Sequence, residues 1–168
     1  EKFADSEPAL MIRKNALKLL QLVNHLLDLR KVDAKQMQLN VKENNIVEFI
    51  NGISGSFETL AQKKNIDLRL NSRLTNTQAY FDHEKLEKIV SNLLSNALKY
   101  TPNNGKINIG ISESNKGLCS IEISDNGIGI SEKDIQHIFN RFYRVDQNDG
   151  QGTGIGLALV KELVDVHR

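Results

Sequence analysis

The chain has 168 residues, and 22 Lys and Arg against 21 Asp and Glu give it a net charge of +1 at pH 7. A charge so near zero gives no reason to expect a nucleic-acid partner. Its 39% hydrophobic residues are typical of a globular domain, and no apolar run approaches the roughly 20 residues of a membrane span. The single cysteine, Cys119, cannot form a disulfide within the chain. We expect it to be a small buried hydrophobe in a reducing, cytoplasmic setting.

The first predicted element is a long helix between residues 10 and 32. Apolar residues recur there at alternating steps of four and three, as in a heptad seam: Ile12, Ala16, Leu19, Val23 and Leu26. A four-helix bundle is favoured over a two-stranded coil because further leucines widen the stripe: Leu20, Leu22, Leu27 and Leu29. One helix cannot bury such a stripe alone. We therefore expect a second copy, or helices outside this chain, to cover it.

Residues 35–42 are polar and mark a boundary after the first helix. A second helix is predicted to begin at Asn44 or Asn45, which are both good N-cap residues. Its core face follows a helical period: Ile46, Ile50, Ile53, Phe57 and Leu60. Two short strands are expected next, at residues 66–70 and 80–81.

A third helix is predicted from Asp82, its cap, to about Tyr100. Two alternating runs, residues 106–112 and 118–124, then predict a hairpin whose turn falls at residues 115–117. Ser131 is expected to cap a short helix, and a last helix is expected from residue 155 to 166. This order predicts an α+β fold with helices on one face of a mostly antiparallel sheet.

The third helix carries a polar row beside its buried face. Asn92, Asn96 and Lys99 recur at steps of four and three, and they lie about 120° around the helix from its apolar positions, Leu86, Val90, Leu93 and Ala97. Asn is a poor helix former, so a plain solvated face would more readily carry other residues. The alternatives are a polar surface stripe and a row that lines a cleft. In a cleft, an amide oxygen suits Mg²⁺ and a lysine suits phosphate.

Two glycine-bearing segments lie in the last third of the chain. Residues 125–129, Asp-Asn-Gly-Ile-Gly, follow a predicted strand and by themselves indicate only a turn. Residues 150–157, Gly-Gln-Gly-Thr-Gly-Ile-Gly-Leu, open the last helix, where bare N–H groups favour an anion. Neither a P-loop nor a Rossmann pattern is present. Together with the polar row, the segments predict a magnesium-nucleotide site in which a carboxylate binds the base.

Four segments in order resemble the asparagine, first glycine, phenylalanine and second glycine boxes of sensor histidine kinases: residues 92–100, 125–129, 139–144 and 152–157. The resemblance implies the Bergerat ATP-binding fold, an α/β sandwich, over residues 41–168. Residues 1–40 resemble part of the dimerisation and phosphotransfer hairpin, mainly its second helix. The run 24–31 is most similar to hybrid sensors of Bacteroides-type bacteria.

The resemblance also implies roles for matching residues, with ATP and Mg²⁺ as cofactors. Asn96 would ligate Mg²⁺ with support from Asn92, Lys99 and Arg144 would contact phosphate, and Asp125 would accept the adenine amine. Further nucleotide contacts would come from Tyr100, Gly127, Gly129, Ile130, Phe142, Gly152, Thr153, Gly154, Gly156 and Leu157. Residues 145–152 would form a short ATP lid, whose base would be anchored by Phe139 and Phe142.

Asn92 indicates which reaction is favoured. In the hydrolytic relatives that the resemblance brings in, a Glu stands four residues before the magnesium ligand and activates water. Asn92 occupies that position in this chain. An amide cannot act as a base, so transfer to a histidine is favoured over hydrolysis. None of the four histidines, His25, His83, His137 and His167, fits the family's acceptor pattern. The acceptor is therefore expected on a helix absent from this chain.

The expected function is γ-phosphoryl transfer from ATP to that histidine, then to an aspartate of a response-regulator receiver domain. The implied partners are ATP or ADP, the dimerisation helix and a second protomer. A cytoplasmic domain of a membrane-anchored sensor is expected, with its anchor and two C-terminal strands outside the sequence. The alternatives are an ATP-hydrolysing switch of the same fold and a non-catalytic nucleotide-binding or dimerising module.

Overall fold

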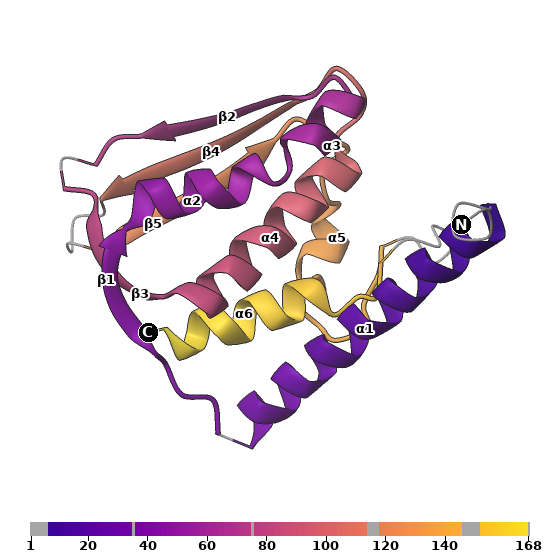
Figure 1. Ribbon diagram of the computed structural model, residues 1–168, viewed down its shortest axis with the longest axis horizontal. Helices are drawn as coiled ribbons and strands as arrows, with labels where there is room; N and C mark the ends of the chain where they lie inside the picture. The colour runs from indigo at the N-terminus through magenta and orange to yellow at the C-terminus, as the bar shows by residue number, and fades with distance from the viewer. Residues whose placement is uncertain (1–6, 35, 75, 114–117, 146–151, 168) are drawn as a thin grey trace.

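The computed structural model describes residues 7–34, 36–74, 76–113, 118–145 and 152–167. A long helix leads into a compact body of strands and helices (Figure 1). The elements follow in this order: α1 Glu7–Asp33, β1 Val41–Asn45, α2 Ile46–Gly55, α3 Glu58–Lys63, β2 Asp67–Ser72, β3 Gln78–Asp82, α4 His83–Tyr100, β4 Lys106–Glu113, β5 Cys119–Asp125, α5 Glu132–Ile135 and α6 Gly156–Val166. The expected α+β class is confirmed.

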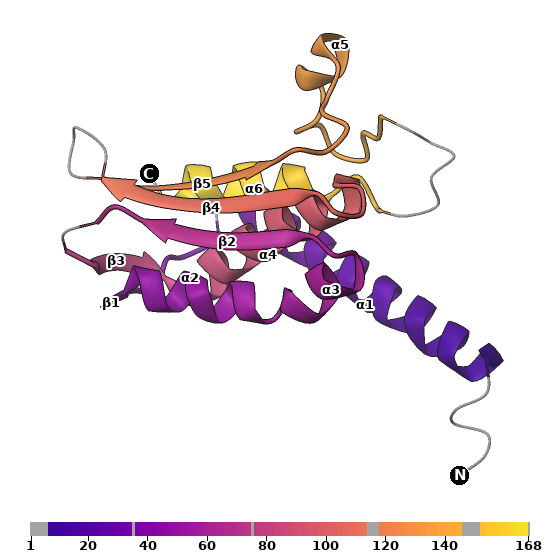
Figure 2. The same cartoon turned by 90° about the horizontal axis from the view of Figure 1, so that it is seen from above.

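The strands form two small sheets. In the larger, with order β2-β4-β5, β2 runs parallel to β4, and the predicted hairpin places β4 antiparallel to β5. In the smaller, β1 and β3 pair antiparallel. Ile107, Ile109 and Ile111 of β4 are buried while alternate residues are exposed or partly exposed, because the helices cover one face of this sheet. Figure 2 shows that arrangement edge on, with α5 standing clear of the sheet.

Two apolar clusters meet at α4. The first joins α2, α4 and the larger sheet, and it includes Ile50, Leu94 and Ile109. The second joins α1, α4 and α6, and it includes Leu29 and Leu159. α4 therefore lies between the sheet on one side and α6 with α1 on the other, so its polar row has a fixed orientation.

Some expectations were wrong. Strand β1 was not predicted, because its residues are mostly polar and exposed. Leu60 is 48% exposed and Ala61 is buried instead, since α2 ends at Gly55 and the phase changes before α3. Cys119 is exposed, because it pairs with Glu113 at the far end of β5. Ser131 precedes α5, but its hydroxyl donates to the carboxylate of Asp134 instead of capping the backbone.

The expected hairpin turn at residues 115–117 lies outside the described residues. None of the helices in the described part of the chain combines the length and the apolar character that crossing a membrane requires.

Candidate functional site

The start of α4 is fixed by Asp82, which is only 2% exposed. Its carboxylate accepts the backbone N–H of Lys85 at 3.1 Å, the Lys85 ammonium at 2.6 Å and the backbone N–H of Asn40 at 2.7 Å. Burial acts to raise the pKa of Asp82, but these hydrogen bonds from Lys85 and Asn40 prevail and lower it to about 2. A cap this well bonded sets the position of every side chain that follows along α4.

Asn92 lies against the first residue of α6. Its side-chain N–H donates to the carbonyl oxygen of Lys88 at 2.7 Å. Its amide oxygen faces Gly156 so closely that a Cβ added at residue 156 would lie 2.8 Å from it. The glycine therefore allows α6 to begin beside the polar row, and Ile155, Leu159 and Leu163 are buried behind that contact.

Lys99, at the C-terminal end of the polar row, lies next to the glycine-rich segment. Its ammonium lies 2.9 Å from the hydroxyl of Tyr100 and 4.5 Å from the centre of that ring. A Cβ added at Gly152 would lie 3.5 Å from the same ammonium. Asn96 is half-buried on α4 between Asn92 and Lys99. The predicted row thus faces one side of the segment that opens α6.

The Asp125 loop packs on the C-terminal end of α4, at Tyr100. One carboxylate oxygen of Asp125 accepts the backbone N–H of Gly127 at 2.8 Å, and the N–H of Ile128 donates to the Tyr100 carbonyl at 3.4 Å. A Cβ added at Gly127 would lie 2.6 Å from that carbonyl oxygen. Gly129 has φ +69°. Asp125 is exposed, and so is Ile130, which follows the loop. The glycines therefore let the loop reach α4.

The phenylalanine box joins the glycine-rich segment through backbone contacts. Phe142 adopts a left-handed φ of +65°, and its N–H donates to the carbonyl of Gly154 at 2.9 Å. Gly154 has φ +70°, and a Cβ there would lie 2.6 Å from the Phe142 carbonyl carbon. The Phe142 side chain is 63% exposed, and Phe139 is exposed too. Arg144 is half-buried two residues further along.

Asp134, which sequence reasoning missed, anchors this segment. Its buried carboxylate accepts from Ser131 and, at 2.7 Å, from the Tyr143 hydroxyl. These two hydrogen bonds lower the pKa of Asp134. A short acidic helix before an aromatic run was the available signal, and it was too weak to assign a role.

The two ends of the site are held on one helix. Asn92 and Tyr100 are eight residues apart, which is about 12 Å along α4. Thr153 and Leu157 lie in the segment that opens α6, where the Thr153 hydroxyl accepts the Ile155 N–H at 3.4 Å. Of the predicted lid, residues 146–151 lie outside the described residues.

Residues 81–168 match the sequence model of the family described as histidine kinase-, DNA gyrase B- and HSP90-like ATPase. The chain belongs to this ATPase family. The kinase branch is indicated by the curated relatives. The chain is 38% identical over 165 residues to histidine kinase P4 of Formosa agariphila, and the match covers 95% of this chain and 12% of the relative. It is 42% identical over 162 residues to the sensor histidine kinase TmoS of Ectopseudomonas mendocina, with coverage of 94% and 16%.

Solved structures agree with this assignment. The histidine kinase AdeS of Acinetobacter baumannii is similar with a TM-score of 0.77 at 25% identity, over 96% of this chain and 74% of that one. Full-length ShkA in complex with AMPPNP has the same fold, with a TM-score of 0.84 at 24% identity over 94% of this chain and 33% of that one. The chain is thus an ATP-binding catalytic domain of the sensor histidine kinase type, as its four boxes predicted, and it spans only a small part of its curated relatives.

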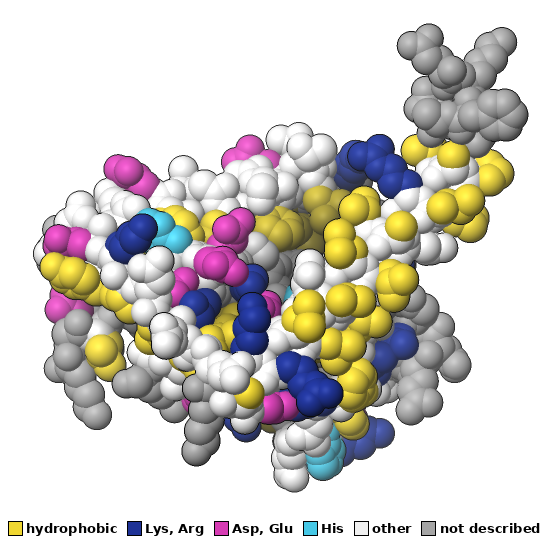
Figure 3. Space-filling view, turned by 60° about the horizontal axis from the view of Figure 1, so that its bottom comes forward, with side chains coloured by type: hydrophobic (Ala, Val, Ile, Leu, Met, Phe, Trp, Pro, Cys, Tyr) yellow, Lys and Arg dark blue, Asp and Glu magenta, His cyan; other side chains and the backbone are white. Residues whose placement is uncertain are grey.

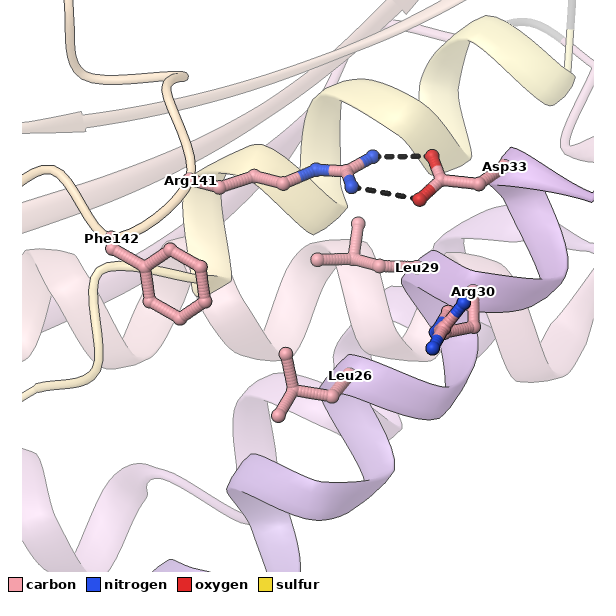
Figure 4. A pocket seen from close by; sticks show the side chains of 6 residues that line it. All are labelled: Leu26, Leu29, Arg30, Asp33, Arg141 and Phe142. Carbon is pink, nitrogen blue, oxygen red and sulfur yellow. Dashed lines mark hydrogen bonds and ion pairs between the residues drawn. The ribbon is translucent and has the colours of Figure 1, made fainter.

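In this kinase domain, α1 packs against the body near its C-terminal end. Leu29 is 2% exposed in the second cluster, and its neighbour Asp28 bonds the Lys88 ammonium at 2.9 Å. A cavity of about 360 Å³ opens beside this contact, lined by Leu26, Leu29, Arg30, Asp33, Arg141 and Phe142 (Figure 4). No local sequence signal predicted the contact.

Most of α1 remains uncovered. Its apolar side chains form a stripe along the helix that leads away from the body (Figure 3). The exposed members are Leu10, Met11, Ile12, Leu17, Leu19, Leu20, Val23, Leu26 and Leu27. A stripe of this length on a kinase domain is a surface that needs a covering element.

Proposed function

We propose that this domain binds MgATP and transfers its γ-phosphoryl group to a histidine on another helix, from which an aspartate of a response regulator receives it. The observation that carries the proposal is Asn92. It occupies the polar row at the start of α6, and its amide is bonded to the Lys88 carbonyl and packed against Gly156. A residue in that position without a basic atom does not activate water.

The nucleotide would lie along α4. Asp125 would accept the adenine amine, with Gly127 and Gly129 leaving room for the ring and Tyr100 and Ile130 beside it. This orientation is supported by the contact of the Asp125 loop with the end of α4.

The phosphates would lie at the start of α6. Lys99 faces Gly152, and the bare N–H groups at Gly154 and Gly156 suit an anion. Thr153, Leu157 and Arg144 would complete this end. The Phe142 N–H, which donates to the Gly154 carbonyl, would hold the backbone of the segment in place.

Mg²⁺ would be held by the amide oxygen of Asn96 with Asn92 in support. Within the described residues no group of three His, Cys, Asp or Glu could hold a metal. A single protein oxygen completed by phosphate oxygens and water is the usual manner of binding for this ion. When bound, Mg²⁺ neutralises phosphate charge. The protein's own contribution is to position the phosphates and to exclude a water-activating base.

A second copy of the chain is the proposed cover for the apolar stripe of α1. The α1 helices of two protomers, each with the other helix of its hairpin, would form the four-helix bundle that the width of the stripe favours. Two relatives support further parts of the proposal: ShkA is solved in complex with AMPPNP, and the histidine kinase ThkA in complex with the response regulator protein TrrA. The parent protein is proposed to be a sensor whose membrane anchor lies in other segments.

The test is transfer to a separate acceptor. The chain is mixed with a helical hairpin that carries the acceptor histidine and with ATP labelled at the γ-phosphate. We expect acid-labile phosphohistidine on the hairpin. Asn96→Ala should reduce labelling at least about a hundredfold, since loss of the proposed Mg²⁺ ligand removes charge stabilisation at the phosphates and raises the barrier by about 3 kcal/mol. Ser95→Ala, at the exposed neighbouring position, is the matched control and should leave labelling unchanged.

Two outcomes contradict the proposal. Steady multiple-turnover phosphate release without phosphohistidine would assign the domain to the hydrolysing switches. ATP binding with neither product would make it a nucleotide-binding module.

A further inference from the structure

The end of α1 is paired with the phenylalanine box. The Asp33 carboxylate accepts two hydrogen bonds from the Arg141 guanidinium, at 2.8 and 2.6 Å, in a bidentate arrangement (Figure 4). The same guanidinium lies 3.6 Å from the Glu162 carboxylate on α6. Arg141 therefore connects three elements: α1, the phenylalanine box and α6.

A second contact holds α1 to the middle of α4. The Lys88 ammonium bonds Asp28 at 2.9 Å and Glu84 at 2.9 Å, and the Lys88 carbonyl accepts the Asn92 side-chain N–H at 2.7 Å. Leu29, buried in the second cluster, lies between Asp28 and Asp33 in the sequence. The last two turns of α1 are thus attached to the body at two places.

Both attachments continue into the candidate phosphate site. Arg141 precedes Phe142, whose N–H bonds the Gly154 carbonyl and whose backbone leaves no room for a side chain at Gly154. From Lys88, the path runs through Asn92 to Gly156, where an added Cβ would lie 2.8 Å from the Asn92 amide oxygen. The contacts form a closed ring from α1 through the start of α6 and back, so a shift of α1 would act on the candidate phosphate-binding backbone from both sides.

We propose that Arg141, by holding Asp33, is a positioning residue that fixes the glycine-rich start of α6, so that docking of α1 and binding of ATP stabilise each other. The inference rests on the proposed function and adds a regulator of the same site. The left-handed conformation of Phe142 is unfavourable for a residue with a side chain, so it requires surrounding contacts to persist. The pair with Asp33 supplies one of them. By linkage, nucleotide must strengthen docking by the factor that docking strengthens nucleotide.

The pKa values of the pair agree with this contact. The hydrogen bond from Arg141 lowers the pKa of Asp33, and the hydrogen bond to Asp33 raises the pKa of Arg141. Because the carboxylate is favoured when docked, docking persists at neutral pH and weakens as pH falls through the lowered pKa of Asp33.

The experiment measures AMPPNP affinity of the full chain by calorimetry. Asp33→Asn alters no residue of the matched family region, yet we expect it to weaken binding about fivefold, the lower end of usual coupling. Arg141→Lys keeps the charge but loses the two-pronged hydrogen bonding, so its effect should be smaller. Glu7→Gln makes the same change of charge at the exposed start of α1 and should leave affinity unchanged.

A second measurement reports docking directly. Dyes on Cys119 and on a Lys14→Cys variant, both exposed positions, give the distance between α1 and the sheet. In Asp33→Asn the distances should spread without AMPPNP and narrow when it is added. If the unaltered chain binds AMPPNP and Asp33→Asn binds it equally well, the inference is wrong while the proposed function stands. If the unaltered chain does not bind AMPPNP, the proposed function itself fails.

Discussion

The two long helices of the chain are covered to very different extents. Of the 27 residues of α1, two are buried, Asp28 and Leu29. Of the 18 residues of α4, six are buried, and they contact clusters on both sides: Leu86, Ile89, Val90, Leu94, Ala97 and Leu98. Both sequences are amphipathic, so apolar periodicity alone does not reveal which helix the chain itself covers. The difference means that α4, and the candidate site it carries, is positioned by contacts within the described residues, whereas those residues leave most of α1 uncovered.

The largest expected effect comes from removing equal side chains from the two helices. Leu94 on α4 is fully buried and Leu19 on α1 is 61% exposed. Leu94→Ala should lower the free energy of unfolding by about 3 kcal/mol, from lost burial and the cavity it leaves. Leu19→Ala should change it by less than about 0.5 kcal/mol in the monomer. Denaturant unfolding at low protein concentration measures both.

The two variants should also behave differently at high protein concentration. If a second copy covers α1, Leu19→Ala should weaken self-association measured by sedimentation, while Leu94→Ala acts on folding. Equal losses of monomer stability from the two variants would show that α1 is covered within the chain, contrary to the difference in burial between the two helices.

A smaller effect concerns the cap that fixes α4. The folded pKa of Asp82, about 2, lies below its ordinary value of 3.8, so the carboxylate stabilises the fold above about pH 4. That contribution, roughly 2 kcal/mol, is lost as pH falls through 2. Asp82→Asn keeps a capping oxygen but removes the charge. Its free energy of unfolding should therefore be lower than that of the unaltered chain at pH 6, and the gap should close by pH 2.

The control for Asp82 is Asp67, which pairs with Arg69 on an exposed strand surface. Asp67→Asn should leave the free energy of unfolding nearly unchanged at either pH, because solvent screens this exposed ion pair. A gap of equal size for the two variants would mean that burial of the cap does not matter.

The smallest effect is expected at His25 on α1. Its Nδ1 atom is buried without a hydrogen-bond partner among the described residues. Burial lowers the pKa of His25, with Asp28 acting to raise it and Lys88 to lower it. The docked helix therefore binds fewer protons than the free one, and docking should weaken slightly as pH falls below about 6.5. In His25→Leu, the distance between the two dyes should not respond to pH over that range.

The sequence predicted most helices because their caps and apolar periods are local signals, as at Asn45 and Asp82. It failed at β1, because this strand is held by pairing with β3 and its polar residues show no apolar alternation. It failed again at Leu60, where one break between helices shifted the phase of every residue after it.

The roles of the candidate site residues stay predictions, but the structure does place several of them near one another. The structure places Asn92 beside Gly156 and Lys99 beside Gly152. Glycine was a usable signal because it marks places where the backbone comes close to another group. The pair of Asp33 and Arg141 could not be predicted. These residues are 108 positions apart, and charged residues near a helix end occur in any chain.

The mixed pairing of the larger sheet sets an order for folding. β5 follows β4 directly, and Glu113 pairs with Cys119, so this hairpin can close in about 1–10 μs. β2 pairs in parallel with β4, Leu68 with Ile107, across a connection that contains β3 and all of α4. Closing that longer loop costs more chain entropy and comes later. We therefore expect the Asp125 loop to form with the early hairpin and the polar row to reach it only when α4 docks. The candidate nucleotide site would then be completed in a late folding step.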